Sequence, residues 1–161
     1  MKQILFFLFF FITISYSQTK YVVKSDSILV NKSLELAISQ NGTKEKTGKN
    51  DGYMVEQYLK SVNLRKGQPY CAAFQYWSFK KINDSLNLHK SIPLPRRGST
   101  NGIYDYMRKN GSKAVYEAKI NDLIVWKYSN SYSGHIERVI KVEKGGWVTT
   151  IAANTSNGKS G

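Results

Sequence analysis

The most informative stretch of the chain runs from residue 67 to residue 82 and has the sequence GQPYCAAFQYWSFKKI. Gly67-Gln68-Pro69 breaks the preceding segment, and the apolar residues that follow have the spacing of an amphipathic helix, predicted over 71–82. Cys71 therefore lies at or near a helix N-terminus, where free N–H groups and the helix dipole favour a thiolate. Position alone leaves a nucleophilic thiol and a buried packing residue as equal alternatives.

Outward from this helix, the chain is predicted to form helices first and strands afterwards. The predicted helices cover residues 32–40, 55–62, 71–82 and about 101–109, with a Gly-rich loop at 42–52. The predicted strands cover residues 123–126, 136–142 and 147–152, with a hairpin turn at 144–146. Helices followed by strands indicate an α+β fold.

Residues 1–17 have the pattern of a cleaved secretory signal peptide. Lys2 supplies a positive charge, the run from Ile4 to Ile14 is apolar, and Ser15-Tyr16-Ser17 places small residues before a cleavage site at Gln18. The run is shorter than the about 20 residues that span a bilayer. We therefore expect an exported chain, periplasmic or extracellular, that begins at Gln18 and has no stable membrane span; an uncleaved anchor is the alternative.

Composition and charge limit the class of protein. The chain has 161 residues, of which 41% are hydrophobic and 22% charged, as expected for a globular protein. Its 24 Lys and Arg exceed its 11 Asp and Glu, which gives a net charge of +13. Loss of Lys2 with the signal peptide lowers this to about +12, which still favours anionic partners. The basic residues are scattered and match no nucleic-acid motif, so we expect an anionic envelope polymer as partner rather than nucleic acid.

The chain has one cysteine, Cys71, and two histidines, His89 and His135. Cys71 has no partner for an internal disulfide. In an exported chain such a thiol is either buried and inert or retained because it is reactive. A cysteine nucleophile needs a base, usually histidine. His89 lies in a polar loop, whereas His135 follows Gly134 at the start of a predicted strand. We therefore expect His135 to be the base, with a purely structural strand-edge histidine as the alternative.

A third side chain must orient the imidazole of such a base. Glu137 alternates with His135 along the predicted strand and so shares its face. Glu143 also alternates but lies farther along the strand. Asn154 lies at the end of the next predicted strand, just beyond residue 152, and a hairpin would return it to a place beside His135. This pairing favours Asn154, with Glu137 and Glu143 as the alternatives.

Four segments resemble the CHAP domains of peptidoglycan hydrolases, within the NlpC/P60-like papain superfamily. They are the nucleophile segment at 67–74, the first core strand at 121–126, the histidine strand at 133–136 and the third catalytic segment at 150–156. Their order and spacing over about residues 32–158 carry the resemblance.

The resemblance implies a papain-like α+β fold, in which N-terminal helices pack on a small antiparallel sheet. The domain is expected to cover residues 32–161, after a lead at 18–31. The family cleaves peptide or N-acetylmuramoyl-L-alanine amide bonds in peptidoglycan. Carried over, Cys71 is the nucleophile, His135 the base and Asn154 the polar partner, with an oxyanion hole of backbone N–H groups near Cys71. The ligands of the calcium loop found in some members have no match, so we expect no metal and no other cofactor.

Two departures from the family pattern bear on activity. CHAP domains typically carry an acid two residues before the asparagine, and that position here is Ala152. They also usually continue into a further strand, which this domain is expected to lack. The first expectation is therefore a secreted amidase or endopeptidase with a Cys-His-Asn site, in which Ala152→Glu would raise activity. The alternative is a catalytically weak or inactive CHAP-like protein that binds wall fragments or a protein partner.

Overall fold

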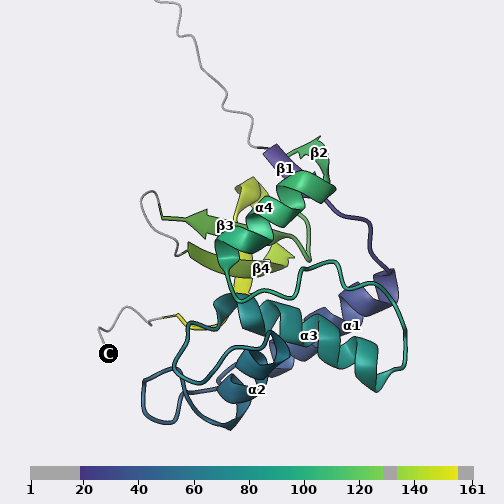
Figure 1. The fold of residues 1–161 in the computed structure, drawn as a ribbon. Coiled ribbons are helices and arrows are strands. Elements are labelled where there is room, and N and C mark those ends of the chain that lie inside the picture. Colours follow the sequence, from purple (N-terminus) through teal and green to yellow (C-terminus); the bar gives the residue numbers. More distant parts are fainter. Residues whose placement is uncertain (1–18, 129–133, 156–161) are drawn as a thin grey trace, which may run out of the picture.

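The computed structural model describes residues 19–128 and 134–155 (Figure 1). The predicted signal peptide and its cleavage site lie outside the described residues. Within them the helices are α1 (Ser27–Ser39), α2 (Tyr53–Ser61), α3 (Cys71–Ser85) and α4 (Thr100–Asn110). The strands are β1 (Thr19–Val22), β2 (Ser112–Val115), β3 (Leu123–Lys127), β4 (Gly134–Val142) and β5 (Val148–Ala152), with a short 3-10 turn, η1 (Lys144–Gly146), between the last two.

Helix α3 forms the centre of the core. The residues from Cys71 to Phe79 are all buried, which confirms the helix predicted over 71–82 and explains its apolar composition. The helix packs against α1, α2 and β4. From α2, the ring of Tyr58 contacts Phe74 and Trp77 with centroid distances of 5.2 and 4.8 Å. The segment that the sequence predicts to carry the nucleophile is therefore also the segment against which α1 and α2 pack.

Helix α1 begins at Ser27 and not at residue 32, so the predicted start is wrong. The carboxylate of Asp26 caps the helix by accepting a hydrogen bond from the N–H of Leu29 at 3.0 Å. The buried face of α1 includes Ser33, whose polar side chain interrupts the apolar spacing. Periodicity alone therefore misses the first turns of this helix and assigns them to the lead at 18–31.

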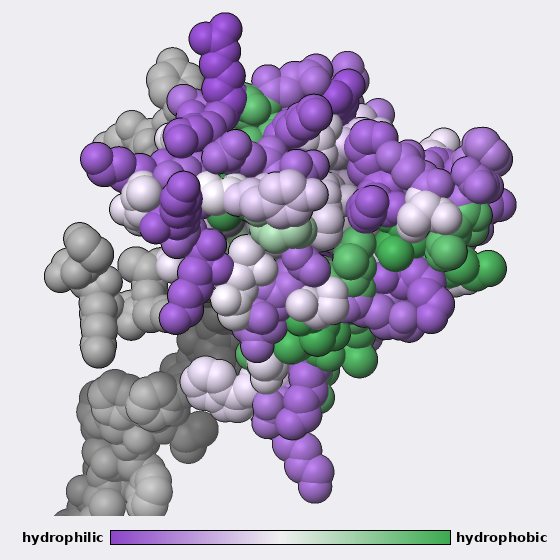
Figure 2. Space-filling model, turned by 90° about the horizontal axis from the view of Figure 1, so that it is seen from below, coloured by the Kyte–Doolittle hydropathy of each residue, from purple (hydrophilic) through white to green (hydrophobic). Residues whose placement is uncertain are grey.

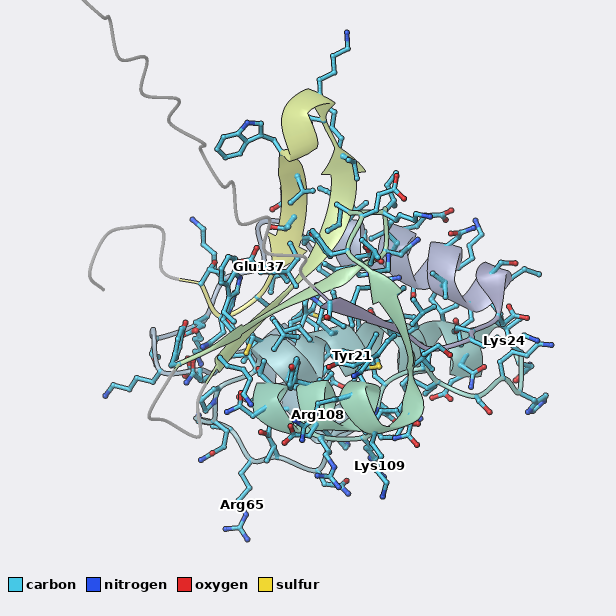
Figure 3. All side chains as sticks on the ribbon, turned by 90° about the horizontal axis from the view of Figure 1, so that it is seen from above. Tyr21, Lys24, Arg65, Arg108, Lys109 and Glu137 are labelled. Atoms are coloured by element: carbon cyan, nitrogen blue, oxygen red, sulfur yellow. The ribbon has the colours of Figure 1, made fainter. Side chains whose placement is uncertain are left out.

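Strands β3, β4 and β5 form an antiparallel sheet in that order, as predicted. Trp126 of β3 pairs with His135 of β4, and Glu137 of β4 pairs with Ala152 of β5. The β4–β5 hairpin projects from the body of the molecule (Figure 3). Helix α4 contacts β3 and β4 while α3 contacts β4, which confirms an α+β fold with helices packed on a small antiparallel sheet.

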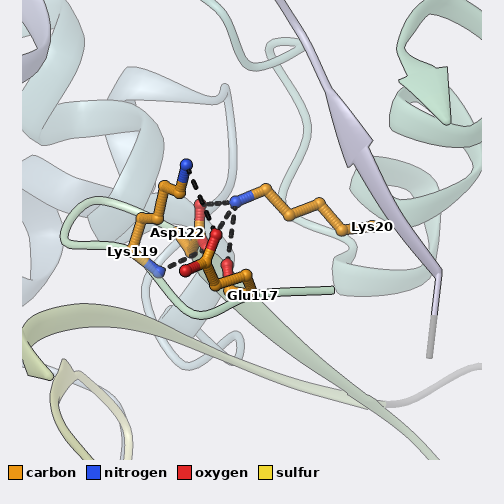
Figure 4. Close-up of polar contacts among 4 residues, drawn as sticks. All are labelled: Lys20, Glu117, Lys119 and Asp122. Carbon is orange, nitrogen blue, oxygen red and sulfur yellow. Dashed lines mark hydrogen bonds and ion pairs between the residues drawn. The ribbon is translucent and has the colours of Figure 1, made fainter. Parts of the chain in front are cut away.

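A two-stranded sheet of β1 and β2 is absent from the sequence prediction. Thr19 pairs with Val115, and strands this short and this far apart in sequence leave little local pattern. Lys20 of β1 joins this sheet to the start of β3 (Figure 4). Its ammonium lies 2.8 Å from the carboxylate of Asp122 and donates to the carbonyl of Glu117 at 3.3 Å. The contact fixes the N-terminal strand beside the larger sheet.

Arg138 of β4 is fully buried and ties the sheet to the helices. Its Nη2 donates to the carbonyl of Val30 at 2.8 Å, to Ser33 Oγ at 3.0 Å and to Asn121 Oδ1 at 2.7 Å. The guanidinium carbon lies 4.5 Å from the centroid of the Phe79 ring in α3. Burial lowers the pKa of Arg138 to about 10. These contacts anchor the strand that carries His135 to both α1 and α3.

The face of the molecule seen from below is largely hydrophilic (Figure 2). Hydrophobic residues gather in one part of it. Arg65, Arg108 and Lys109 are exposed and point away from the body (Figure 3). No helix in the described ranges is both long and apolar enough to cross a bilayer.

Candidate active site

Cys71 is the first residue of α3, as the sequence predicts. Gly67, with a φ of 88°, allows the reversal that leads into the helix. Tyr70 occupies the N-cap position and makes no side-chain capping hydrogen bond to the first turn of the helix. Cys71 is a free cysteine and only 5% exposed. A thiol in this place has N–H donors next to it and little contact with water.

His135 is the second residue of β4, so the sheet carries it to the N-terminal end of α3. Its backbone pairs with Trp126 in the neighbouring strand, and its side chain is 16% exposed. The imidazole and the Cys71 thiol interact closely enough for each to shift the pKa of the other. The structure therefore brings together the two residues that the sequence proposed as nucleophile and base.

The pKa values of these two side chains move in opposite directions. Burial alone would raise the pKa of Cys71, but hydrogen bonds from His135 and Thr100, the charge of His135 and the N–H of Ala72 hold it below its ordinary value. Hydrogen bonding to Cys71 raises the pKa of His135 against the effect of burial, and the charges of Cys71 and Glu137 raise it further. The surroundings favour a thiolate beside an imidazolium, which is the reactive form of a cysteine nucleophile.

Thr100 and Gly134 complete the surroundings of the sulfur. Thr100 begins α4, is 4% exposed, and has its Oγ1 3.5 Å from Cys71 Sγ. The carbonyl oxygen of Gly134 lies 4.0 Å from the same sulfur. The sequence assigns Thr100 no role, because a threonine at a helix start predicts a cap and not a contact with a thiol in another helix.

The atoms packed around position 134 leave no room for a side chain, so this position needs glycine. A Cβ at this position would lie 2.5 Å from the carbonyl oxygen of Trp126 and 3.1 Å from Asn101 Oδ1. Glycine therefore lets the start of β4 pack against β3 and α4, and this packing holds His135 in place.

Glu137 lies next to His135 on the same strand. Its Oε1 is 3.6 Å from His135 Nε2, and its Oε2 accepts a hydrogen bond from Thr150 Oγ1 at 2.7 Å. Glu143, the other acidic candidate, lies toward the tip of the hairpin and accepts instead from Thr149 Oγ1 at 3.1 Å. The structure thus places one of the two glutamates, and not the other, beside the imidazole.

Asn154 is aligned with His135 but makes no side-chain hydrogen bond to it within the described residues. Because Glu137 pairs with Ala152, continuing the register by two residues places Asn154 opposite His135. Strand β5 ends at Ala152, however, and Asn154 adopts a φ of 60° in the turn that follows. Its backbone N–H bonds to the hydroxyl of Tyr70, the residue before Cys71. A role for the Asn154 side chain toward His135 stays a prediction.

The second histidine lies elsewhere. His89 is exposed and follows the C-terminal end of α3, whereas Cys71 begins this helix. A helix of 15 residues is about 22 Å long, so His89 is remote from the thiol. No cluster of three His, Cys, Asp or Glu side chains able to hold a metal occurs in the part of the chain that the structure describes.

An α+β fold that presents a thiol from a helix N-terminus to an imidazole on an antiparallel sheet is that of a papain-like protein. The family model of the CHAP domain matches residues 63–154, more than half of the chain, so the chain belongs to the CHAP domain family. The match includes Cys71 and His135 and ends at Asn154. No curated protein and no solved structure matches the chain. Membership indicates a peptidoglycan hydrolase family of amidases and endopeptidases, in agreement with the resemblance seen in the sequence.

Proposed function

We propose that this protein is an exported, cysteine-dependent peptidoglycan amidase or endopeptidase, with Cys71 as nucleophile and His135 as base. The observation that carries the proposal is the placement of the Cys71 thiol, at the N-terminus of α3, in hydrogen-bonding contact with the imidazole of His135 at the start of β4; this contact lowers the pKa of the thiol and raises that of the imidazole.

The first half of the reaction forms a thioester. Cys71 Sγ attacks the carbonyl carbon of the scissile amide, a C–S bond forms, and the carbonyl electrons move to the oxygen. When the tetrahedral adduct collapses, the C–N bond breaks and the leaving nitrogen takes a proton from the imidazolium of His135. The amine departs, and the acyl group stays on Cys71.

The second half restores the enzyme. His135, now neutral, takes a proton from a water molecule whose oxygen attacks the thioester carbon. The C–S bond breaks, the carboxylic acid product leaves, and the thiolate–imidazolium pair forms again. In both halves the carbonyl oxygen carries negative charge, and the uncapped N–H groups at the start of α3 are suited to stabilise it.

The charge of the chain supports a wall polymer as substrate. The net charge, +13 for the full chain and about +12 without Lys2, and the exposed Arg65, Arg108 and Lys109 favour contact with anionic envelope material. Export through the sequence at residues 1–17 would bring the protein to that material.

Digestion of purified peptidoglycan tests this function. The wild-type protein should release soluble fragments and new amino groups, while Cys71→Ala and His135→Ala should release neither and keep the far-UV circular dichroism of the folded protein. The masses of the fragments show whether an N-acetylmuramoyl-L-alanine bond or a peptide bond is cut. Sedimentation of wild-type protein with peptidoglycan that it leaves uncut would contradict hydrolysis and support the alternative of a CHAP-like binding protein.

A further inference from the structure

The family pattern expects a carboxylate at position 152, yet the structure has one directly across the sheet from that position. Glu137 and Ala152 are Cα partners in the β4–β5 ladder, so their side chains leave the sheet on the same face. A carboxylate can therefore reach the same region from either strand. In this chain the β4 position is the acidic one.

We propose that Glu137 is the positioning residue for His135, in place of an acid at position 152, and that Thr150 fixes the Glu137 carboxylate for this task. The proposal rests on the proposed function only in taking His135 as the base. Its geometric support is the 3.6 Å between Glu137 Oε1 and His135 Nε2, which places a carboxylate charge against the imidazole.

Thr150 gives the carboxylate a defined orientation. Its hydroxyl donates to Glu137 Oε2 at 2.7 Å, which leaves Oε1 as the oxygen that faces the imidazole. Thr150 and Ala152 alternate along β5 and so share the face on which Glu137 lies. A glutamate side chain free to rotate would orient an imidazole poorly, and this hydrogen bond across the strands limits that rotation.

The contact also selects a proton arrangement on the imidazole. A carboxylate oxygen on the Nε2 side of the ring favours a proton on Nε2, which would leave Nδ1 to exchange a proton with Cys71. The titratable side chains that act on His135 are Cys71 from α3 and Glu137 from β4, while the hydroxyl of Thr150 comes from β5. Loss of the Glu137 charge should therefore be visible at His135 even without catalysis.

The pairing revises the expectation for Ala152. A glutamate introduced there would face Glu137 directly, and like charges at paired positions of a ladder repel each other. Ala152→Glu alone should thus fail to raise activity. The double variant Glu137→Ala/Ala152→Glu moves the carboxylate from one strand to its partner position and should restore much of what Glu137→Ala loses.

The test is the pKa of His135 measured by NMR titration in the Cys71→Ala background, where the thiol no longer contributes. Adding Glu137→Gln should lower the pKa of His135, because the negative charge that stabilises the imidazolium is gone, and should leave His89 unchanged as internal reference. Glu143→Gln is the matched control, since it removes the same charge from another threonine-bonded glutamate of the same hairpin. An unchanged His135 titration in Glu137→Gln would overturn the proposal.

A second variant and a kinetic measurement complete the test. In protein with Cys71 intact, Glu137→Gln should lower kcat by between about 10-fold and the about 10⁴-fold seen when the carboxylate of a serine triad is neutralised, with KM little changed. Thr150→Val should lower kcat less, and Thr149→Val not at all; equal effects of the two threonine variants would contradict the role of Thr150.

If Glu137→Gln does not fold, the NMR titration of His135 in Thr150→Val takes its place as the deciding measurement. A wild-type protein that cuts no peptidoglycan, but whose His135 pKa still depends on Glu137, would refute the proposed function and leave the positioning role intact.

Discussion

Glu137 of β4 lies directly opposite Ala152 of β5 in the antiparallel ladder, and its carboxylate lies beside the imidazole of His135. The sheet therefore offers two neighbouring positions from which one acid can approach the same base. Occupation of one makes the other unfavourable for a second acid. The absence of an acid at position 152 is therefore weak evidence for an inactive site, because the paired position in β4 carries Glu137.

Cys71 should be alkylated by iodoacetamide at pH values where a free thiol, with a pKa of about 8.5, is mostly protonated. The reason is that His135 and Thr100 hold the pKa of Cys71 below its ordinary value despite burial, so the thiolate persists as the pH falls. His135→Gln should move the rate–pH profile to higher pH. A wild-type profile that coincides with that of glutathione would show that Cys71 is only a packing residue.

Thr100→Val should also move the alkylation profile of Cys71 to higher pH. Valine keeps the shape of the buried side chain but removes the hydroxyl that lies 3.5 Å from Sγ and favours the thiolate. Thr149→Val, whose hydroxyl contacts Glu143 and not the thiol, is the control and should leave the profile unchanged. Equal profiles for Thr100→Val and the wild type would exclude this role for Thr100.

Gly134→Ala should lower both the stability and the reactivity of the site. The added methyl group would lie 2.5 Å from the carbonyl oxygen of Trp126, so β4 must shift at a cost of about 1–3 kcal/mol in the free energy of unfolding. Because His135 is the next residue, Cys71 alkylation at low pH should slow as well. Gly102→Ala in α4 is the control: its neighbour is the flexible Arg97 side chain, so it should stabilise the helix by up to about 1 kcal/mol. Equal melting temperatures for Gly134→Ala and the wild type would contradict this packing.

Arg138→Ala should lower the free energy of unfolding by about 2–5 kcal/mol, the range for large-to-small changes in a core. Truncation removes three hydrogen bonds to α1 and to the loop before β3, together with the contact to Phe79. Denaturant titration measures the change, and the exposed Arg108→Ala should stay within about 0.5 kcal/mol of the wild type. A loss at position 138 no larger than at position 108 would rule out the anchoring role.

The sequence predicts the parts of this molecule that local patterns encode. The break at residue 67 and the apolar run after it locate α3 and Cys71, and the run at 136–142, rich in Val and Ile, locates the strand that His135 begins. The start of α1 is missed because Ser33 interrupts the apolar spacing of the buried face. Its hydroxyl oxygen accepts a hydrogen bond from Arg138. The β1–β2 sheet is missed because its partners lie far apart in sequence.

Sequence patterns alone do not decide which side chain orients His135. Alternation places Glu137 on the face of His135, and hairpin pairing places Asn154 opposite it, so both remain candidates from sequence. What separates them is side-chain and turn geometry: Thr150 holds the Glu137 carboxylate, while β5 ends before Asn154. The contact of Thr100 with the sulfur likewise depends on how α3 and α4 pack, which no local pattern of the chain encodes.

Acid-quenched reactions of the wild-type protein with soluble peptidoglycan fragments put the thioester mechanism to its sharpest test. Intact-mass and peptide-mass analysis should find the acyl part of the substrate attached to the peptide that contains Cys71, and hydroxylamine should remove it because the bond is a thioester. Cys71→Ala should carry no such mass and release no product. Product release by Cys71→Ala at the wild-type rate, with no acyl adduct on the wild-type protein, would contradict the role of Cys71 as nucleophile.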